Sequence, residues 1–267
     1  MKLKYNSTKL GMLMAAFLFT QRMAVNAQFT FATNNGTLTI VSYAGTQSTV
    51  TIPRETNGMS IVAIANNAFL DDGSHGLINI TIPNSITSIG SSAFGGNVWL
   101  SSATIPNSVT NLGDNAFSYC PSMTSAVIGS GIKSLNGFTF SQCYSLQAVF
   151  FQGNAPSAGN EFYSDNNVTV YYLPGTTNWS STFAGRPAVL WNPQFSVTDG
   201  SFGIRSNRFG FNVVGTSNIP IALEACTNLT SGNWQRLQTC TLTNGSIYLF
   251  DTNWTNSKVR FYRVSAP

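Results

Sequence analysis

The chain has 267 residues, of which 8% are charged, 43% are hydrophobic and 12% are aromatic. Its formal charge of +4 comes from 13 basic and 9 acidic residues, but four of the basic ones (Lys2, Lys4, Lys9 and Arg22) precede residue 28. Removal of that segment leaves 9 basic and 9 acidic residues, so the net charge gives no argument for binding nucleic acid or an anionic membrane.

Residues 1–27 have the features of an export signal. A basic start is followed by an apolar run over 10–20, which is shorter than the ~20 residues needed to span a bilayer. Small residues then predict cleavage between Ala27 and Gln28. No later segment is long and apolar enough to be transmembrane. We therefore expect an exported bacterial protein that is secreted or lies at a cell surface.

A repeat with a period of 23 residues follows. The segment 80–85 recurs at 103–108, and a weaker copy occupies 126–131. Alternating apolar residues in each copy predict a short strand that points every second side chain inward. One copy cannot bury its own apolar side chains, so neighbouring copies must cover them in a stack. We expect four full coils and a fifth partial one within residues 50–154. Each clear copy contains an aligned phenylalanine: Phe94, Phe117 and Phe140.

The copies carry a family resemblance. The sequences I-T-I-P-N-S-I-T-S-I-G-S-S-A-F at 80–94 and A-T-I-P-N-S-V-T-N-L-G-D-N-A-F at 103–117 closely resemble BspA-type leucine-rich repeats. Cys120 and Cys143, three residues after the phenylalanine, also fit that family. The chain departs from the pattern at Gly129 and Ser130 in the third copy and at Asn97, which replaces a cysteine.

The resemblance covers about residues 29–190 and has structural and functional implications. The segment 34–40 looks like the hairpin that precedes such repeats, so 28–49 is expected to be an N-terminal β-hairpin cap. The family implies a surface or secreted protein that needs no cofactor. Its members are associated with adhesion to host or matrix proteins or to neighbouring cells.

Two further regions follow the repeats. Residues 155–193 are predicted to form a C-terminal cap and linker, in which Trp179 and Phe183 cover the open end of the stack. Residues 194–267 contain short apolar or alternating runs separated by turn signals, which predict a small antiparallel β-sandwich similar to immunoglobulin or fibronectin modules. The fold class is therefore mainly β: a short leucine-rich-repeat solenoid followed by a sandwich.

The outward positions of the predicted repeat strands are the candidate surface for an unknown protein or glycan partner. If the cap or the C-terminal module covers Phe150, that part of the surface is internal. The two predicted outward columns are Thr51, Thr81, Thr104, Val127 and Phe150, and, beside them, Asn79, Ser102 and Ser125.

The four cysteines form two pairs by spacing. Cys226 and Cys240 are equidistant from Asn233 in a predicted turn, which suggests a disulfide or a plain buried pair. Cys120 and Cys143 are one coil apart. Because stacked side chains point the same way, this second pair is better explained as a ladder of buried thiols.

Few residues could support catalysis or metal binding. His75 lies in a Gly-containing loop with Asp71 and Asp72, which could form a carboxylate–imidazole site but is better explained as a solvated loop. Glu161 and Asp165 could be imagined as glycosidase carboxylates. Neither group has a supporting motif, so we predict no catalytic, metal-binding or cofactor-binding residue.

The sequence thus favours a non-enzymatic binding protein that acts through its repeat surface. One alternative is a carbohydrate-binding accessory protein that uses Trp234, Trp254, Tyr248 and Phe250, although such rings in a small sandwich are usually core. A structural coat or attachment protein is another alternative.

Overall fold

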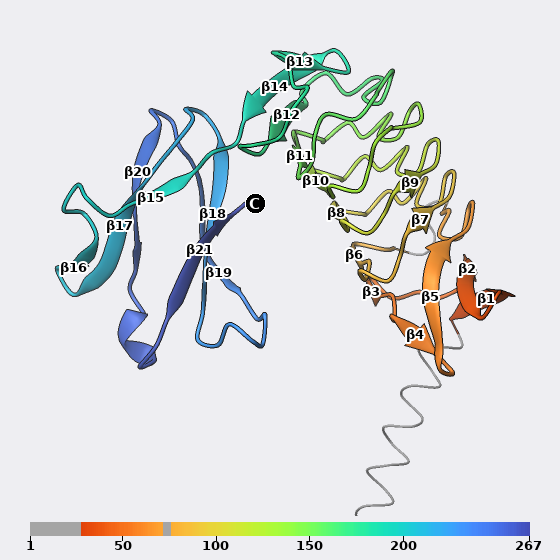
Figure 1. The fold of residues 1–267 in the computed structure, drawn as a ribbon, viewed down its shortest axis with the longest axis horizontal. Coiled ribbons are helices and arrows are strands. Elements are labelled where there is room, and N and C mark those ends of the chain that lie inside the picture. The colour runs from red at the N-terminus through yellow and green to blue at the C-terminus, as the bar shows by residue number, and fades with distance from the viewer. Residues whose placement is uncertain (1–27, 72–75) are drawn as a thin grey trace, which may run out of the picture. The chain divides into compact units, whose positions relative to one another are not determined.

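The computed structural model describes residues 28–71 and 76–267 (Figure 1). The expected export signal through Ala27, as well as Asp72 and His75, lies outside the described residues. The described chain divides into two compact units. The first unit comprises the described residues up to Gln147 together with the later segment Pro156–Val168. The second comprises Ala148–Ala155 and Thr169–Pro267.

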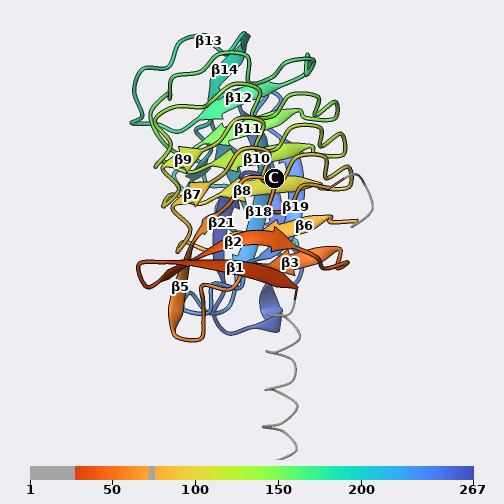
Figure 2. The same ribbon diagram turned by 90° about the vertical axis from the view of Figure 1, so that its right-hand side faces the viewer.

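The first unit is built from short strands joined by turns (Figures 1 and 2). The first two strands form an antiparallel hairpin around Asn35 and Gly36, which both have positive φ, as two-residue hairpin turns require. The strands are β1 (Phe29–Asn34), β2 (Thr37–Tyr43), β3 (Thr49–Thr51), β4 (Glu55–Thr56), β5 (Met59–Ile64), β6 (Asn79–Thr81), β7 (Ser88–Ile89), β8 (Ser102–Ile105), β9 (Asn111–Leu112) and β10 (Ser125–Ile128).

Parallel pairing between successive coils reproduces the sequence repeat. β2, β5, β7 and β9 follow one another along one side of the stack. On another side, β3 pairs with β6 and β8 pairs with β10, so that Thr51 lies opposite Thr81 and Thr104 opposite Val127. Equivalent residues of neighbouring copies are therefore partners, which confirms the predicted solenoid.

A ladder of aromatic rings runs through the interior of the first unit. One ring from each coil stacks on the next, with centroid distances of 4.9 to 6.1 Å and interplanar angles of 10 to 24°. Each phenylalanine in the ladder is at most 3% exposed. No coil could bury its ring alone, so the rings bind neighbouring coils to one another. The members are Tyr43, Phe69, Phe94, Phe117, Phe140 and Phe162.

Beside the rings, buried polar side chains link consecutive coils. The thiols of Cys120 and Cys143 donate to the carbonyl oxygens of Phe94 and Phe117, at 3.4 and 3.2 Å. Asn97 occupies the equivalent position one coil earlier, and its Nδ2 donates to the Phe69 carbonyl at 2.7 Å. These contacts confirm the ladder of buried thiols. They also explain how asparagine can replace cysteine, since both side chains supply a donor there.

The glycine of the third copy has a steric cause. A Cβ built on Gly129 would lie 2.4 Å from the carbonyl carbon of Pro106 in the preceding coil. The backbones approach so closely that no larger residue fits without a shift. The departure at this position is therefore a packing requirement of the stack.

The second unit begins with repeat strands. β11 (Ala148–Phe151), β12 (Thr169–Tyr172) and β14 (Arg186–Leu190) are parallel neighbours, and β13 (Thr182–Phe183) pairs antiparallel with β14. Trp179 stacks on Tyr172 with centroids 5.0 Å apart, and Phe183 contacts Phe151 at 5.1 Å. The aromatic residues expected to form a cap therefore pack against the side chains of β11 and β12.

The remaining strands of the second unit form two antiparallel sheets, as expected for a small sandwich. β17 pairs with β15, β16 and β20, and β18 pairs with β19 and β21. Phe211 of β17 and Tyr262 of β21 meet between the sheets, with ring centroids 5.6 Å apart. The elements are β15 (Gln194–Ser196), β16 (Gly203–Arg205), β17 (Arg208–Val214), β18 (Pro220–Cys226), β19 (Gln235–Thr241), β20 (Ser246–Asp251), the 3-10 turn η1 (Trp254–Asn256) and β21 (Phe261–Ser265).

Candidate binding surfaces

The outward strand columns of the first unit are mostly open to solvent and uncharged. Thr51, Thr81 and Thr104 are exposed, and Val127 is half-buried. In the neighbouring column Asn79 and Ser102 are exposed and Ser125 is half-buried. Asn79 also takes part in hydrogen bonds along the column, with Thr49 at 3.5 Å and with Ser101 at 3.3 Å. The columns therefore present a row of hydroxyl and amide groups.

Phe150, which the alternation placed in the outward column, is not available for a partner. It is 6% exposed and lies against two rings of its own unit, Tyr171 at 4.9 Å and Trp191 at 6.0 Å. The stacking with Tyr171 follows from the parallel register, which pairs these two residues. The expected apolar end of the surface is therefore internal.

A third side of the coils carries exposed aromatic rings that the sequence analysis missed. Each lies between two residues before and five residues after a ladder phenylalanine, and each is between 39% and 59% exposed. Backbone hydrogen bonds join this side from coil to coil, for example from Tyr119 N to Ser141 O at 2.8 Å. We call these residues the aromatic edge: Trp99, Tyr119, Phe138, Tyr144 and Tyr163.

The family of the repeats follows from their geometry and sequence together. Residues 62–184 match six copies of the BspA type Leucine rich repeat region. The coils within residues 62–184 are BspA-type leucine-rich repeats. The six copies exceed the four full coils and one partial coil expected from the sequence. The later coils are less regular, since Phe162 follows Phe140 by 22 residues and no I-P-N-S segment accompanies it.

Several solved structures are similar to this chain. The T. pallidum leucine rich repeat protein TpLRR is 19% identical over 56% of this chain and 86% of its own, with a TM-score of 0.41. The pneumococcal vaccine antigen PcpA is 19% identical over 62% of this chain and 48% of its own, with a TM-score of 0.41. A leucine rich cell surface protein from Faecalibacterium prausnitzii is 21% identical over 72% of this chain and 58% of its own, with a TM-score of 0.39.

The chain thus spans less than two thirds of two of these structures. Comparison with curated proteins gave no match. Within the described residues, no helix has the length and apolar character needed to cross a membrane.

The acidic residues considered as catalytic candidates have structural contacts in the BspA-type repeats. Glu161 is fully buried, and its carboxylate accepts hydrogen bonds from the backbone N–H groups of Gly159 at 3.1 Å and Thr139 at 3.2 Å. Asp165 and Asp71 are also buried. Among the residues that the structure describes, no group of three or more His, Cys, Asp or Glu side chains could hold a metal ion.

The C-terminal aromatic residues considered for sugar binding make contacts within the sandwich. The Arg263 guanidinium lies 4.4 Å from the ring centroid of Trp234, and that of Arg208 lies 4.5 Å from Phe250. Trp254 donates its indole N–H to the Asn207 carbonyl at 3.3 Å. Tyr248 and Phe250 lie beside each other, with ring centroids 6.4 Å apart. Among the described residues, no ring contact joins Trp234 or Trp254 to this pair, so the four rings do not form one platform.

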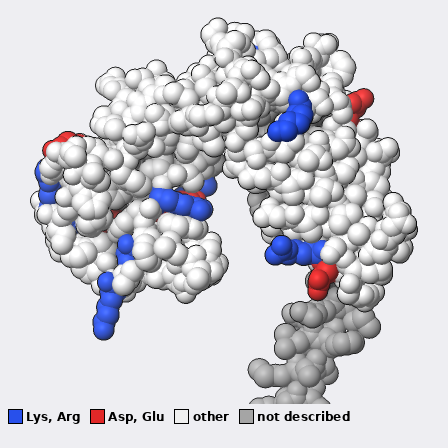
Figure 3. All heavy atoms as spheres, viewed as in Figure 1, with Lys and Arg blue, Asp and Glu red and all other residues white. Residues whose placement is uncertain are grey.

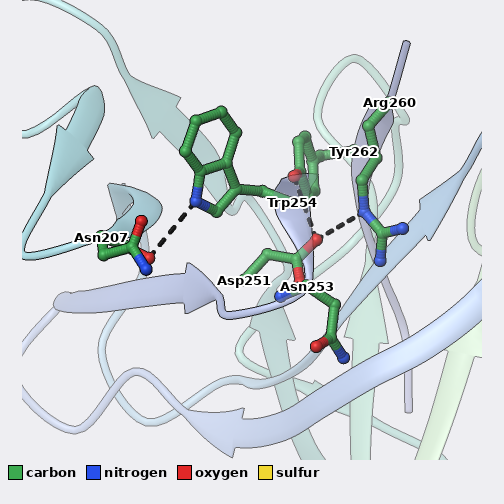
Figure 4. A network of polar contacts seen from close by, with 6 residues as sticks. All are labelled: Asn207, Asp251, Asn253, Trp254, Arg260 and Tyr262. Atoms are coloured by element: carbon green, nitrogen blue, oxygen red, sulfur yellow. Dashed lines mark hydrogen bonds and ion pairs between the residues drawn. The ribbon is translucent and has the colours of Figure 1, made fainter. Parts of the chain in front are cut away.

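A buried ionic network joins the end of β20 to β21 (Figure 4). Asp251 is 3% exposed and accepts hydrogen bonds from Arg260 Nε, from the Tyr262 hydroxyl at 3.1 Å and from the Asn253 backbone N–H at 2.8 Å. Burial, together with the negative charge of Asp251, raises the pKa of Tyr262 to about 12. Tyr262 therefore stays protonated and remains a donor to the carboxylate well above neutral pH.

The suggested Cys226–Cys240 disulfide is wrong, because the strand register separates the two residues. Cys240 lies opposite Ile221 near the start of β18, whereas Cys226 lies at its end, opposite Phe261. Five residues along a strand span about 17 Å, more than twice the ~7 Å limit between disulfide-linked Cα atoms. The β18–β19 turn is centred near Thr230 and not at Asn233, as the pairing of Pro220 with Thr241 shows.

We therefore predict that all four cysteines are thiols, as they are in the structure. Iodoacetamide added to the unfolded, unreduced protein should attach four groups, and prior reduction should not change that number. Intact mass spectrometry measures this. Two adducts without reductant and four with it would show a disulfide. In the folded protein Cys143 should react slowly, because a hydrogen bond with the Cys120 side chain, together with burial, raises the pKa of its thiol.

Proposed function

We propose that this protein is an exported, non-enzymatic binding protein whose BspA-type repeats contact a protein partner through the outward strand columns. The observation that carries the proposal is the register of these columns, which aligns exposed, uncharged side chains from successive coils on one face. A stack of repeats offers an extended surface rather than a cleft, and such surfaces bind macromolecules.

The chemistry of the columns supports broad, weakly polar contact. Threonine, serine and asparagine side chains supply donors and acceptors without a fixed charge, so their desolvation on binding costs less than that of ions. None of the column residues is Lys, Arg, Asp or Glu. Binding through this face should therefore depend little on salt concentration.

Two features support a role outside the cell. The export-type segment at 1–27 precedes the repeats, and serine, threonine and asparagine replace charged residues as the solubilising groups. The F. prausnitzii protein among the similar structures is described as a cell surface protein. We propose secretion or surface display on this basis, with adhesion to host, matrix or neighbouring-cell proteins as the biological outcome.

Paired substitutions on two sides of the same coils test the proposal. Thr81→Arg/Thr104→Arg should reduce capture of a bound extracellular protein by at least about tenfold, because two charged side chains would have to lose water at the contact. The matched control is Thr87→Arg/Thr110→Arg, since these threonines are also exposed but lie beside β7 and β9.

The measurement is capture on the immobilised protein followed by quantitative mass spectrometry, with circular dichroism to verify folding. Equal loss of capture in both folded variants would contradict a specific role of the columns. Undiminished capture by Thr81→Arg/Thr104→Arg would place the contact elsewhere on the chain.

A further inference from the structure

The aromatic edge includes residues with positive φ, a backbone conformation that is unfavourable for large side chains. In each of several coils, the second residue before and the second residue after the ladder phenylalanine have positive φ. Glycine and asparagine are the residues that tolerate this conformation best. The two sets are Asn67, Ser92, Asn115 and Phe138 before the ladder residue, and Gly96, Tyr119, Gln142 and Ser164 after it.

Tyr119 and Phe138 are therefore placed where smaller residues would fold better. Their φ angles are 55° and 63°, and a bulky side chain in this region is a genuine outlier. The equivalent positions in the preceding coil are Gly96 and Asn115. Tyr119 is 50% exposed and Phe138 is 39% exposed, so full burial of the ring does not offset the backbone strain at either residue. Strain of this kind in an exposed position points to a binding role.

The surroundings of the rings indicate the kind of ligand. Across residues 91–99, 114–122, 137–145 and 159–167, Asp114 is the single exposed charged residue, because Glu161 and Asp165 are buried. Apart from the rings and Gly159, the other exposed residues there are serine and asparagine: Ser145, Asn160, Ser164, Asn166 and Asn167. In Figure 3, too, uncharged residues form most of the visible surface of the repeats. A neutral surface of rings and amides is complementary to a neutral ligand rich in hydroxyl groups.

The coils that carry the edge recur at a regular step, although the rings stand at different positions within their coils. Backbone hydrogen bonds fix this side of each coil to the next, and the ladder rings beneath it recur every 4.9 to 6.1 Å. This step is comparable with the length of one pyranose residue in a linear polysaccharide. A polysaccharide lying along the stack would therefore meet a new coil at each sugar, where Tyr and Trp rings can stack on its apolar face.

We propose that the aromatic edge binds an uncharged polysaccharide. The sugar rings stack on Tyr119, Phe138 and their neighbours, and the hydroxyl groups bond to the surrounding amides. Phe138 is held by Tyr163 of the next coil, whose ring meets it edge-on at 5.9 Å. This site lies on a different side of the coils from the strand columns and does not depend on the protein partner proposed above.

Affinity electrophoresis through gels that contain hydroxyethylcellulose, galactomannan or soluble starch tests the site, with polygalacturonate as the charged comparator. At least one neutral polysaccharide should retard the mature protein, and Tyr119→Gly should weaken that retardation by at least about tenfold. The same substitution should raise the melting temperature by about 2–4 °C, because it relieves the left-handed backbone. A change that stabilises the fold and abolishes binding cannot act through unfolding.

Ser92→Gly is the matched control. It relieves a left-handed position of the same kind, with φ of 52°, without removing a ring, so it should raise the melting temperature and leave retardation unchanged. The proposal is overturned if no neutral polysaccharide retards the protein, or if Tyr119→Gly/Phe138→Asn is retarded as strongly as the parent. Stronger retardation by polygalacturonate would also overturn it. So would sedimentation data in which the edge residues join two copies of the chain and no polysaccharide competes.

Discussion

Replacement of Phe117 by alanine should lower the free energy of unfolding of the repeats by about 3–5 kcal/mol. Phe117 is fully buried and stacks between Phe94 at 5.0 Å and Phe140 at 5.8 Å. Its loss leaves a cavity and removes two ring contacts at once. Because each coil is stabilised by its neighbours, the coils on both sides should also exchange amide hydrogens faster. Urea unfolding followed by hydrogen-exchange mass spectrometry measures both effects.

The matched control for this prediction is Phe138→Ala. Phe138 is the same residue type one coil later but is 39% exposed, so its truncation should change the free energy of unfolding by less than about 1 kcal/mol. If Phe117→Ala were as mild as the control, the ladder would not be the main source of cohesion between the coils.

The second large effect is expected in the sandwich. Asp251→Ala should destabilise it by about 3–5 kcal/mol, because the substitution leaves Arg260 partly buried without its counter-ion. The side chains of these residues are 2% and 12% exposed, so water compensates little for the lost partner. Tyr262 loses its acceptor as well. Thermal unfolding followed by tryptophan fluorescence reports this change, since Trp234 and Trp254 belong to the sandwich.

A double-mutant cycle separates the ion pair from general loss of packing. Asp251→Ala/Arg260→Ala should be less destabilised than the sum of the two single variants, because the double variant contains no uncompensated buried charge. Strict additivity of the three free energies would mean that the contact between the two side chains contributes nothing of its own.

The sequence was informative where its period was strong. The 23-residue spacing aligned Phe94, Phe117 and Phe140, and the structure places them in one column. The short apolar or alternating runs found in residues 194–267 likewise correspond to the strands of the sandwich. In both regions local patterns of alternation coincide with tertiary burial, which is the condition for reading structure from a sequence.

Prediction failed where local pattern does not determine the outcome. The Cys226–Cys240 pair depended on the midpoint of one turn, and a small shift of that turn moved the register by several residues. The alternation of inward and outward residues placed Phe150 in the outward column, but its ring is covered by Tyr171 and Trp191, which lie later in the chain. Such coverage is a tertiary effect that alternation within a strand cannot reveal.

The aromatic edge was missed because the apolar pattern does not report backbone angles. A signal was present in the aligned copies, since Gly96 and Asn115 stand at positions that Tyr119 and Phe138 occupy in neighbouring coils. Glycine and asparagine in such positions indicate a left-handed conformation. An aromatic residue aligned with them therefore marks a position where the side chain strains the left-handed backbone.

Site-specific photo-crosslinking tests the proposed binding surface most directly. A photoreactive amino acid is introduced separately at Thr104 in the strand column, at Thr110 on another side of the same coil, and at Tyr248 in the sandwich, and each protein is irradiated with its captured partner. The account predicts a covalent adduct from position 104 and none from 110 or 248. An adduct formed only from position 248 would show that the sandwich, and not the repeat stack, holds the partner.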